Sequence, residues 1–326
     1  LVIYVGGLQV FDKTITTGNI AEFVIYINML TWPVTAIGWI ASIIQQANVS
    51  QGRINEFMNI QPVVENNGSH QGPIKGHLVF DQVTFVYPDT GIKALDRVSF
   101  SIRPGQKVAI IGRTAAGKTT IAELMLRMYD PTSGQILMDG IPLEEYDLKA
   151  LRDNIAYVPQ DVFLFSDTIQ ANIKFGEAAA TDQEMEDYAR HAAVYDDIAG
   201  LPEGFKTRIG ERGITLSGGQ KQRISIARAL IRQPEFVVLD DCLSAVDTHT
   251  EHTIVDFLNR ELVQKTAIFI THRIVGMLEY DQILVMDGGK LVEQGTHEEL
   301  INRQGFYYDL WQQQLVSSLE EEGMAS

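Results

Sequence analysis

One glycine-rich segment has the residue types and the spacing needed to hold a phosphate group. Gly112–Thr119 reads GRTAAGKT, in which four residues separate two glycines and Lys-Thr follows the second. A short apolar run precedes the segment and a helical pattern, TTIAELMLRMY, follows it. The backbone N–H groups of such a loop converge at a helix N-terminus, which carries a partial positive charge. The segment is therefore predicted to be a phosphate-binding loop between a strand and a helix.

Three residues of this loop have separate tasks in binding a nucleotide. Gly117 allows close approach of the backbone, Lys118 reaches the β- and γ-phosphates, and the Thr119 hydroxyl can ligate Mg²⁺. By itself this pattern predicts a P-loop NTPase, a class that includes kinases and GTPases. The predicted nucleotide-binding residues here are Gly112, Arg113, Thr114, Ala115, Ala116, Gly117, Lys118, Thr119 and Thr120.

A carboxylate that could hold the Mg²⁺ follows an apolar run later in the chain. Phe236–Asp240 reads FVVLD, which is typical of a buried strand that ends on an acid. Nucleotides bind at the carboxyl edge of α/β sheets, so Asp240 is predicted to be a Mg²⁺ ligand. Lys107–Ile111 (KVAII) and Thr266–Ile270 (TAIFI) are further runs suited to central strands. We expect a layered α/β domain over residues 75–315.

Between the loop and Asp240 lies a second glycine-rich segment, Leu216–Gln220 (LSGGQ), followed by the helical pattern KQRISIARAL. Ser217, Gly218 and Gly219 would open that helix and offer another backbone cradle for phosphate; the alternative is a serine N-cap on an ordinary helix. In this order the motifs resemble those of ABC transporters. The resemblance implies that Ser217, Gly218, Gly219 and Gln220 bind, in trans, the ATP of an opposing subunit.

The resemblance also implies roles for residues outside the two glycine-rich segments. Tyr87 would stack on adenine, Gln160 (in YVPQD) would contact Mg²⁺ and sense the membrane domain, and His272 (in FITHR) would bind the γ-phosphate. Gly210–Gly213 (GERG) resembles an exporter-specific segment, and Ser244–Asp247 (SAVD) a loop at the dimer interface. The implied metal ligands are Thr119, Gln160 and Asp240, and the implied catalytic residues are Asp241, His272 and Gln160.

Two positions depart from the family pattern. Asp241 stands where the family has a Glu that polarises the attacking water, so its carboxylate is drawn back by about 1.5 Å, one C–C bond. A misplacement of about 1 Å can cost about 100-fold in rate, and slow hydrolysis is therefore expected. Ala115-Ala116 replaces the common Gly-Ser, which matters only if the loop requires a positive φ at Ala115.

The N-terminal part of the sequence predicts membrane helices. Phe23–Gly52 contains no charged residue, and its apolar run exceeds the roughly 20 residues that cross a bilayer; the alternative is a buried helix of a soluble protein. We expect residues 1–61 to be the end of an exporter membrane domain, with a truncated helix at 1–11, a loop, a full helix at about 22–45 and its cytoplasmic extension. A linker at 62–74 and an acidic tail at 316–326 would flank the ATPase domain.

The overall fold class predicted is an α/β P-loop NTPase, an ABC ATPase domain, preceded by transmembrane α-helices. The net charge of −16 opposes nucleic-acid binding, and the single cysteine excludes a disulfide framework and a cysteine-based zinc site. The resemblance implies a multi-pass exporter of the cell membrane, with its ATPase domain in the cytoplasm, contacting lipid and an unknown cargo.

Several alternatives remain open at this point. The chain could pair with itself or, as one half of a heterodimer, with another half-exporter that carries the Glu. A soluble ABC ATPase of DNA repair or translation is opposed by the uncharged segment and the acidic balance. A regulatory ATP-binding module with little turnover is favoured only by Asp241.

Lys118 and Tyr87 should contribute differently to nucleotide affinity. Lys118→Ala removes a charge from the triphosphate and should weaken ATP binding far more than AMP binding. Tyr87→Ala removes a stacking surface and should weaken both about equally. Equilibrium binding of the two nucleotides to each variant measures this, and equal losses for ATP and AMP in Lys118→Ala would contradict the assignment.

Overall fold

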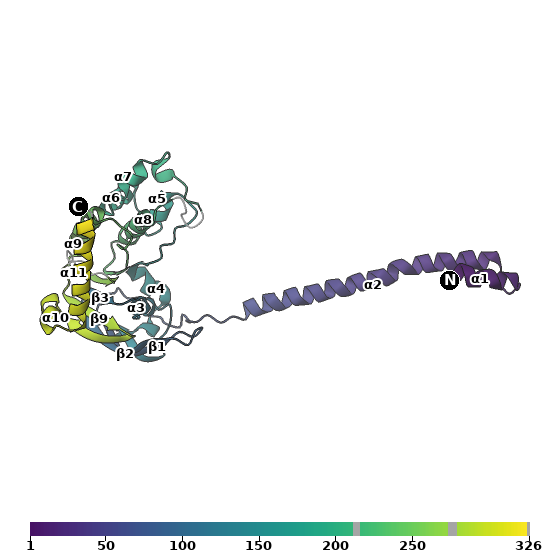
Figure 1. Cartoon of the computed structure of the whole chain (residues 1–326), viewed down its shortest axis with the longest axis horizontal. Helices are drawn as coiled ribbons and strands as arrows, with labels where there is room; N and C mark the ends of the chain where they lie inside the picture. Colours follow the sequence, from purple (N-terminus) through teal and green to yellow (C-terminus); the bar gives the residue numbers. More distant parts are fainter. Residues whose placement is uncertain (211–215, 273–278, 325–326) are drawn as a thin grey trace. The chain divides into compact units, whose positions relative to one another are not determined.

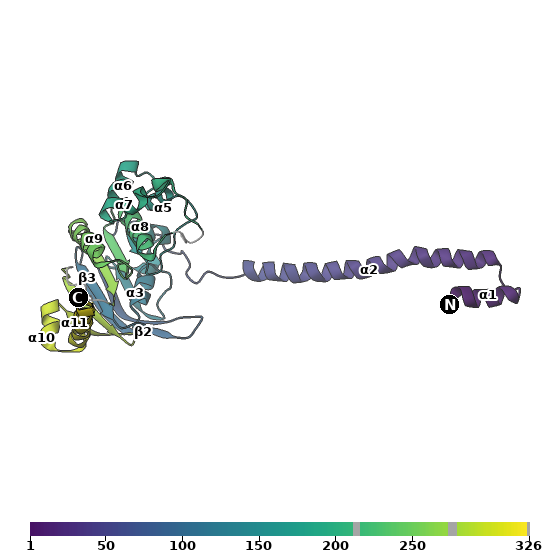
Figure 2. The same ribbon diagram turned by 45° about the horizontal axis from the view of Figure 1, so that its top comes forward.

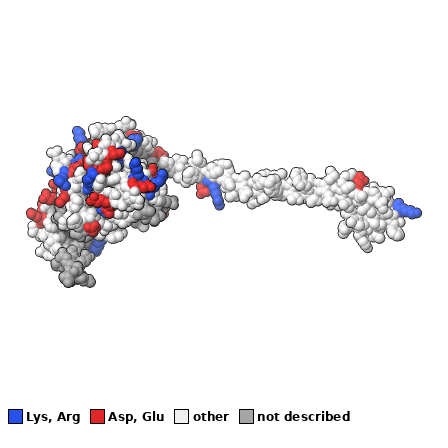
Figure 3. Space-filling model, turned by 90° about the horizontal axis from the view of Figure 1, so that it is seen from above, with Lys and Arg blue, Asp and Glu red and all other residues white. Residues whose placement is uncertain are grey.

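A long apolar helix makes up most of the first of two units, Leu1–Pro62 and Val63–Ser326. The computed structural model describes residues 1–210, 216–272 and 279–324. In the first unit, α1 (Val2–Phe11) is followed by α2 (Thr17–Met58), which contains Pro33. Among the described residues, α2 is the one helix long and apolar enough to cross a membrane. Figure 3 shows that charged side chains are sparse along it and dense over the second unit.

The loop between α1 and α2 is shorter than predicted. Thr16 and Asn19 form a reciprocal capping box, in which the Thr16 backbone N–H donates to Asn19 Oδ1 at 3.0 Å. Such a box satisfies otherwise unpaired N–H groups and starts the helix, so α2 begins at Thr17 rather than near residue 22. At its other end α2 continues without a break through the segment predicted as a cytoplasmic extension.

The strands of the second unit form two sheets. The antiparallel sheet has the order β2-β1-β4-β5, and the six-stranded sheet has the order β10-β9-β3-β8-β7-β6. In the larger sheet every neighbouring pair is parallel except β10 with β9. The strand bounds are β1 (Leu78–Val86), β2 (Lys93–Ile102), β3 (Lys107–Gly112), β4 (Ser133–Met138), β5 (Ile141–Pro142), β6 (Ile155–Val158), β7 (Phe236–Asp240), β8 (Thr266–Thr271), β9 (Gln282–Asp287) and β10 (Lys290–Gly295).

The helices of the second unit vary from short turns to long rods (Figures 1 and 2). Their bounds are α3 (Lys118–Met125), α4 (Leu148–Asn154), α5 (Ile169–Lys174), α6 (Asp182–His191), α7 (Tyr195–Ala199), α8 (Gly218–Leu230), α9 (Thr248–Glu261), α10 (His297–Arg303) and α11 (Phe306–Met324), with 3₁₀ turns at Leu143–Glu145 and Gly204–Lys206. The last helix, α11, runs through most of the segment predicted as an acidic tail.

Both faces of the six-stranded sheet are covered by other elements. Successive side chains of a strand point to opposite faces, so each central strand contributes to a core on either side. In β3, Val108 and Ile110 face a core shared with α3 and the antiparallel sheet. The alternate residues Ala109 and Ile111 pack with Leu300 and Tyr307 of α10 and α11. Side chains of β7 and β8 divide in the same way between the first core and one shared with α6, α8 and α9. The central strands therefore read as continuous apolar runs.

Candidate nucleotide-binding site

The parallel strands bring the predicted residues to one edge of the sheet. Strands β3, β8, β7 and β6 are adjacent and parallel, so their carboxyl ends lie side by side. Lys118 follows the loop after β3, and His272 follows β8. Asp240 ends β7, and Asp241 comes directly after it. Gln160 follows β6. Residues that are widely separated in the sequence thus meet at a single edge.

The phosphate loop has the backbone that the motif requires. Gly117 has a φ of +90°, and a Cβ added to it would lie 2.5 Å from the Ala94 carbonyl oxygen and 2.9 Å from Leu95. A side chain there would therefore be excluded both by conformation and by space. Lys118 Nζ donates to the carbonyl oxygens of Gly112 (2.8 Å) and Arg113 (2.9 Å), so the loop wraps around its ammonium group.

Ala115 has a positive φ, +64°, which is the condition under which alanine in place of glycine matters at this position. An L-residue in this left-handed region is strained by about 1 kcal/mol relative to glycine. Arg113, Thr114 and Ala115 are exposed at the tip of the loop, whereas Ala116 is buried beneath it. The departure from Gly-Ser therefore strains the loop without altering the backbone groups that would face a phosphate.

Asp240 and Thr119, the predicted Mg²⁺ ligands, are in contact. The Thr119 hydroxyl donates to the Asp240 carboxylate, and Tyr157 donates to Asp240 Oδ2 at 3.5 Å. Burial raises the pKa of Asp240 to about 6, and the nearby charge of Lys118 opposes this rise. Two oxygen donors in contact suit Mg²⁺, which prefers oxygen ligands, so the residues present fit the metal.

Asp241 lies between the other two predicted catalytic residues. Its Oδ1 is 3.0 Å from His272 Nδ1, and its Oδ2 accepts from Gln160 Nε2 at 3.4 Å. Its backbone N–H donates to the Ile270 carbonyl oxygen at 2.7 Å, and its φ is +46°. Aspartate adopts this left-handed conformation more readily than most residues. The His272 side chain is 49% exposed and the Asp241 side chain 11%, so the pair opens to solvent on the histidine side.

Tyr87 is joined to the phosphate-loop helix through its hydroxyl. The hydroxyl donates to Glu123 Oε2 at 2.6 Å and lies 2.9 Å from Thr120 Oγ1. Its ring contacts those of Phe85 and Tyr129 edge-on. Burial, followed by the bond to Glu123, raises the pKa of Tyr87 to about 12. The phenol is therefore neutral at physiological pH and held beside α3, while adenine stacking stays a prediction.

Ser217 caps α8, and Gly218 and Gly219 form its first turn. The Ser217 Oγ accepts from the Gln220 backbone N–H at 3.1 Å, and the Ser217 N–H donates to Gln220 Oε1 at 3.0 Å. This geometry is the N-cap that the simpler interpretation of the motif predicted. It does not exclude a cradle, since Ser217 and Gly218 are exposed. A Cβ on Gly219 would lie 2.7 Å from the Ala245 carbonyl oxygen, so this glycine permits close contact with the SAVD loop.

Gln222 was not singled out from the sequence, yet it joins this helix to Asp241. Its Nε2 donates to Ser244 Oγ (3.2 Å) and to the Asp241 carbonyl oxygen (3.5 Å), and its Oε1 accepts from the Ala245 N–H (3.2 Å). Gln222 is 6% exposed, and a buried amide is retained only with such partners. A glutamine on the apolar face of the predicted helix was the available signal. Of the GERG segment, residues 211–213 lie outside the described residues.

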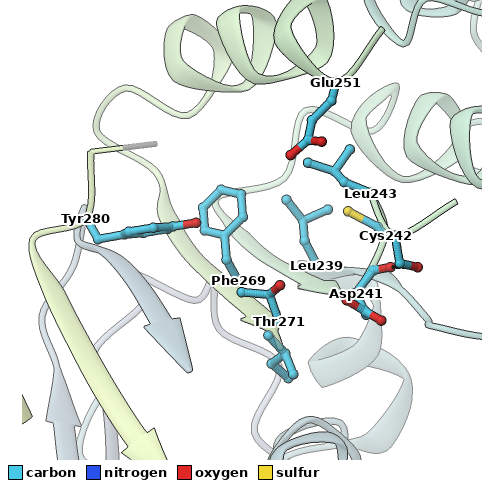
Figure 4. A pocket seen from close by; sticks show the side chains of 10 residues that line it. Leu239, Asp241, Cys242, Leu243, Glu251, Phe269, Thr271 and Tyr280 are labelled. Carbon is cyan, nitrogen blue, oxygen red and sulfur yellow. Dashed lines mark hydrogen bonds between the residues drawn. The ribbon is translucent and has the colours of Figure 1, made fainter. Parts of the chain in front are cut away.

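A small pocket lies behind Asp241 (Figure 4). Asp241, Cys242 and Leu243 line one side, Tyr280 and Phe269 another, and Glu251 extends into it from α9. Burial raises the pKa of the Cys242 thiol to about 12. The thiol is therefore neutral at physiological pH and buried, which is typical of a structural cysteine.

Comparisons with known proteins agree with this geometry. A family model described as ABC transporter matches residues 95–244. The chain is 42% identical over 320 residues to a probable multidrug resistance ABC transporter ATP-binding/permease protein, YheI, of Bacillus subtilis (strain 168), covering 98% of this chain and 54% of that protein. It is 39% identical over 293 residues to the ATP-dependent lipid A-core flippase of Pseudomonas fluorescens (strain Pf0-1), covering 90% and 49%.

A solved structure gives the same relationship. The structure of a bacterial Atm1-family ABC exporter with ATP bound superposes with a TM-score of 0.80 at 37% identity, covering 92% of this chain and 53% of that one. The chain thus spans about half the length of the curated relatives that it matches.

Asp240→Asn should stabilise the folded chain at neutral pH, because it removes a carboxylate whose ionisation the fold disfavours. With a folded pKa of about 6 against an ordinary 3.8, the charged form costs up to about 3 kcal/mol above pH 6. The folded state binds this proton more tightly than the unfolded state, so the contribution of Asp240 to stability falls as the pH rises from about 4 to about 6. The gain in Asp240→Asn should be small at pH 4, grow as the pH rises toward 6 and be nearly complete at pH 7 in urea unfolding.

Asp247→Asn provides the matched control. Asp247 caps α9, and its hydrogen bonds to Thr250 lower the pKa of its carboxyl, so its replacement should give no gain at neutral pH. A stability gain of Asp240→Asn that is the same at pH 4 and pH 7 would contradict the assigned pKa.

Proposed function

Since this chain belongs to the ABC transporter family, we propose that it binds and hydrolyses ATP to drive export across the cell membrane. The observation that carries the proposal is the grouping at the sheet edge, where Asp241 contacts both His272 and Gln160 beside the Lys118 loop. A phosphate cradle, a carboxylate and a histidine close together are the parts that phosphoryl transfer to water requires.

The geometry supports a separate task for each residue. Lys118 and the loop N–H groups would bind the triphosphate, and Thr119, Gln160 and Asp240 would hold Mg²⁺. The bound metal would neutralise charge on the phosphates. Asp241 would orient the attacking water and accept its hydrogen bond, and His272 would contact the γ-phosphate. Tyr87 would pack against the base. Because Asp241 is one methylene shorter than Glu, we expect this site to be slow.

The membrane assignment is supported by α2. Its uncharged stretch is exposed along the helix, which suits a lipid environment and does not suit a soluble ATPase of DNA repair or translation. With α1 it forms an antiparallel hairpin, consistent with a multi-pass protein whose second unit lies in the cytoplasm. The transported substrate is unknown.

Ser217–Gln220 would complete the site of an opposing subunit, so the working form is a dimer. In a homodimer both sites would use Asp241. In a heterodimer the partner would carry Glu, and this chain would retain a weak site while completing the strong one. The second version makes this chain a largely regulatory subunit, and the observation that favours it is Asp241 itself.

Substitutions at Asp241 and Ser217 separate the two dimers. In a homodimer, Asp241→Glu should accelerate ATP hydrolysis by about 10- to 100-fold, since it extends the carboxylate toward the water. In a heterodimer it should change total turnover modestly. Ser217→Arg should stop most turnover in both, because arginine fills the space for the opposing γ-phosphate. The measurement is the steady-state ATPase rate in lipid, with Asp196→Glu, at an exposed position of α7, as the matched control.

Mixing tests the action in trans for the homodimer. Dimers that combine one Lys118→Ala chain with one Ser217→Arg chain retain one site with both halves intact, and should recover part of the activity. A crosslink from residue 217 to ATP bound at Lys118 of the same chain would instead show that the cradle acts in cis.

A further inference from the structure

The helix α11 is fixed to the second unit at its N-terminal end. Glu293 on β10 accepts hydrogen bonds from the backbone N–H groups of Phe306 and Tyr307, at 2.9 Å each. A carboxylate at this position satisfies unpaired N–H groups and complements the helix dipole. Tyr307 is fully buried against Ile111 of β3, and its hydroxyl lies 2.7 Å from His297 Nδ1. The start of α11 is therefore held by the core.

From this anchor α11 extends from the phosphate loop, near Arg113, to the backbone of His272. At its first turn the Phe306 ring lies 4.9 Å from the guanidinium carbon of Arg113 in the phosphate loop. Gln314, eight positions later and about 12 Å along the helix axis, donates through Nε2 to the His272 carbonyl oxygen at 2.7 Å. Figures 1 and 2 show α11 beside α10 on one side of the second unit.

The contact with His272 lies just beyond the end of the sheet. The ladder between β8 and its neighbours ends by Thr271, so the sheet pairing does not hold the carbonyl of His272. The His272 ring is at the same time paired with Asp241 at 3.0 Å. A shift of this backbone would therefore move the imidazole relative to Asp241 and to the phosphate, and such shifts are costly in rate.

We propose that α11 is a positioning element of the nucleotide site, in which Gln314 holds the backbone of His272 so that its ring can engage the terminal phosphate. The inference rests on the proposed role of His272. Core packing explains how the start of α11 is held at Tyr307. It does not explain the contact of Gln314, which lies two turns further along the helix and adds little to the core.

Three substitutions of Gln314 test the hydrogen bond. Gln314→Ala removes the donor, Gln314→Glu keeps the shape without a donor when ionised, and Gln314→Lys restores an N–H donor of similar reach. In steady-state ATP hydrolysis by the full chain in lipid, we expect kcat to fall about 3- to 10-fold in the Ala and Glu variants with KM within about twofold. The Lys variant should recover most of the loss.

Gln312→Ala is the matched control, since among the described residues the Gln312 side chain bonds only within α11, to the Tyr308 hydroxyl at 2.9 Å. It should leave kcat and the thermal midpoint unchanged. A purely structural role of Gln314 would lower the thermal midpoint without a selective loss of kcat. Equal kcat in the wild type and in the Ala and Glu variants, or an equal loss in Glu and Lys variants, would overturn the proposal.

An NMR measurement that does not depend on ATP turnover can test the contact between Gln314 and His272 separately from the proposed ATPase activity. The ring ¹⁵N resonances of His272, assigned by their loss in His272→Ala, should shift in Gln314→Ala and Gln314→Glu and stay in place in Gln312→Ala. Unchanged His272 resonances in the Ala and Glu variants would overturn the proposal. Shifted resonances in a chain that hydrolyses no ATP would support the contact and refute the proposed ATPase activity.

Discussion

The parallel pairing of β3, β8, β7 and β6 is the constraint on which the site depends. Because adjacent parallel strands end at one edge, Lys118, His272, Asp241 and Gln160 meet there although the chain separates them widely. The sheet is rigid because its central strands are buried on both faces. Functional side chains therefore stand on short extensions of a fixed scaffold, which keeps their mutual distances small and defined.

The same edge carries unfavourable features that a purely structural domain would avoid. Burial raises the pKa of Asp240 and lowers that of Lys118, although opposite charges lie nearby. Ala115 and Asp241 both have positive φ values without being glycine. Strain and disfavoured charges gather at functional sites because the surrounding structure tolerates them there. Positive φ values also occur at non-glycine residues far from this edge, so it is the disfavoured charges of Asp240 and Lys118 that support the location of the site independently of the motifs.

The helix after the LSGGQ motif is connected to the site on its own chain. Gln222 contacts Asp241 and the SAVD loop, and Gly219 allows that loop to approach. The helix that Ser217 caps is thus attached, through the Gln222 side chain, to the backbone of Asp241 in the same chain.

The phosphate loop, the buried strands and the apolar helix were predictable from the amino-acid sequence, because they depend on local spacing and periodicity, and the order of the motifs carried the resemblance to ABC transporters. The conformation of Ala115, the partners of the Tyr87 hydroxyl and the contacts of Gln222 and Gln314 became visible only in the folded chain. The contacts of Tyr87, Gln222 and Gln314 join residues 19 to 42 positions apart in the sequence. The sheet order and the packing of helices against it set such contacts, and neither leaves a periodic signal in the chain.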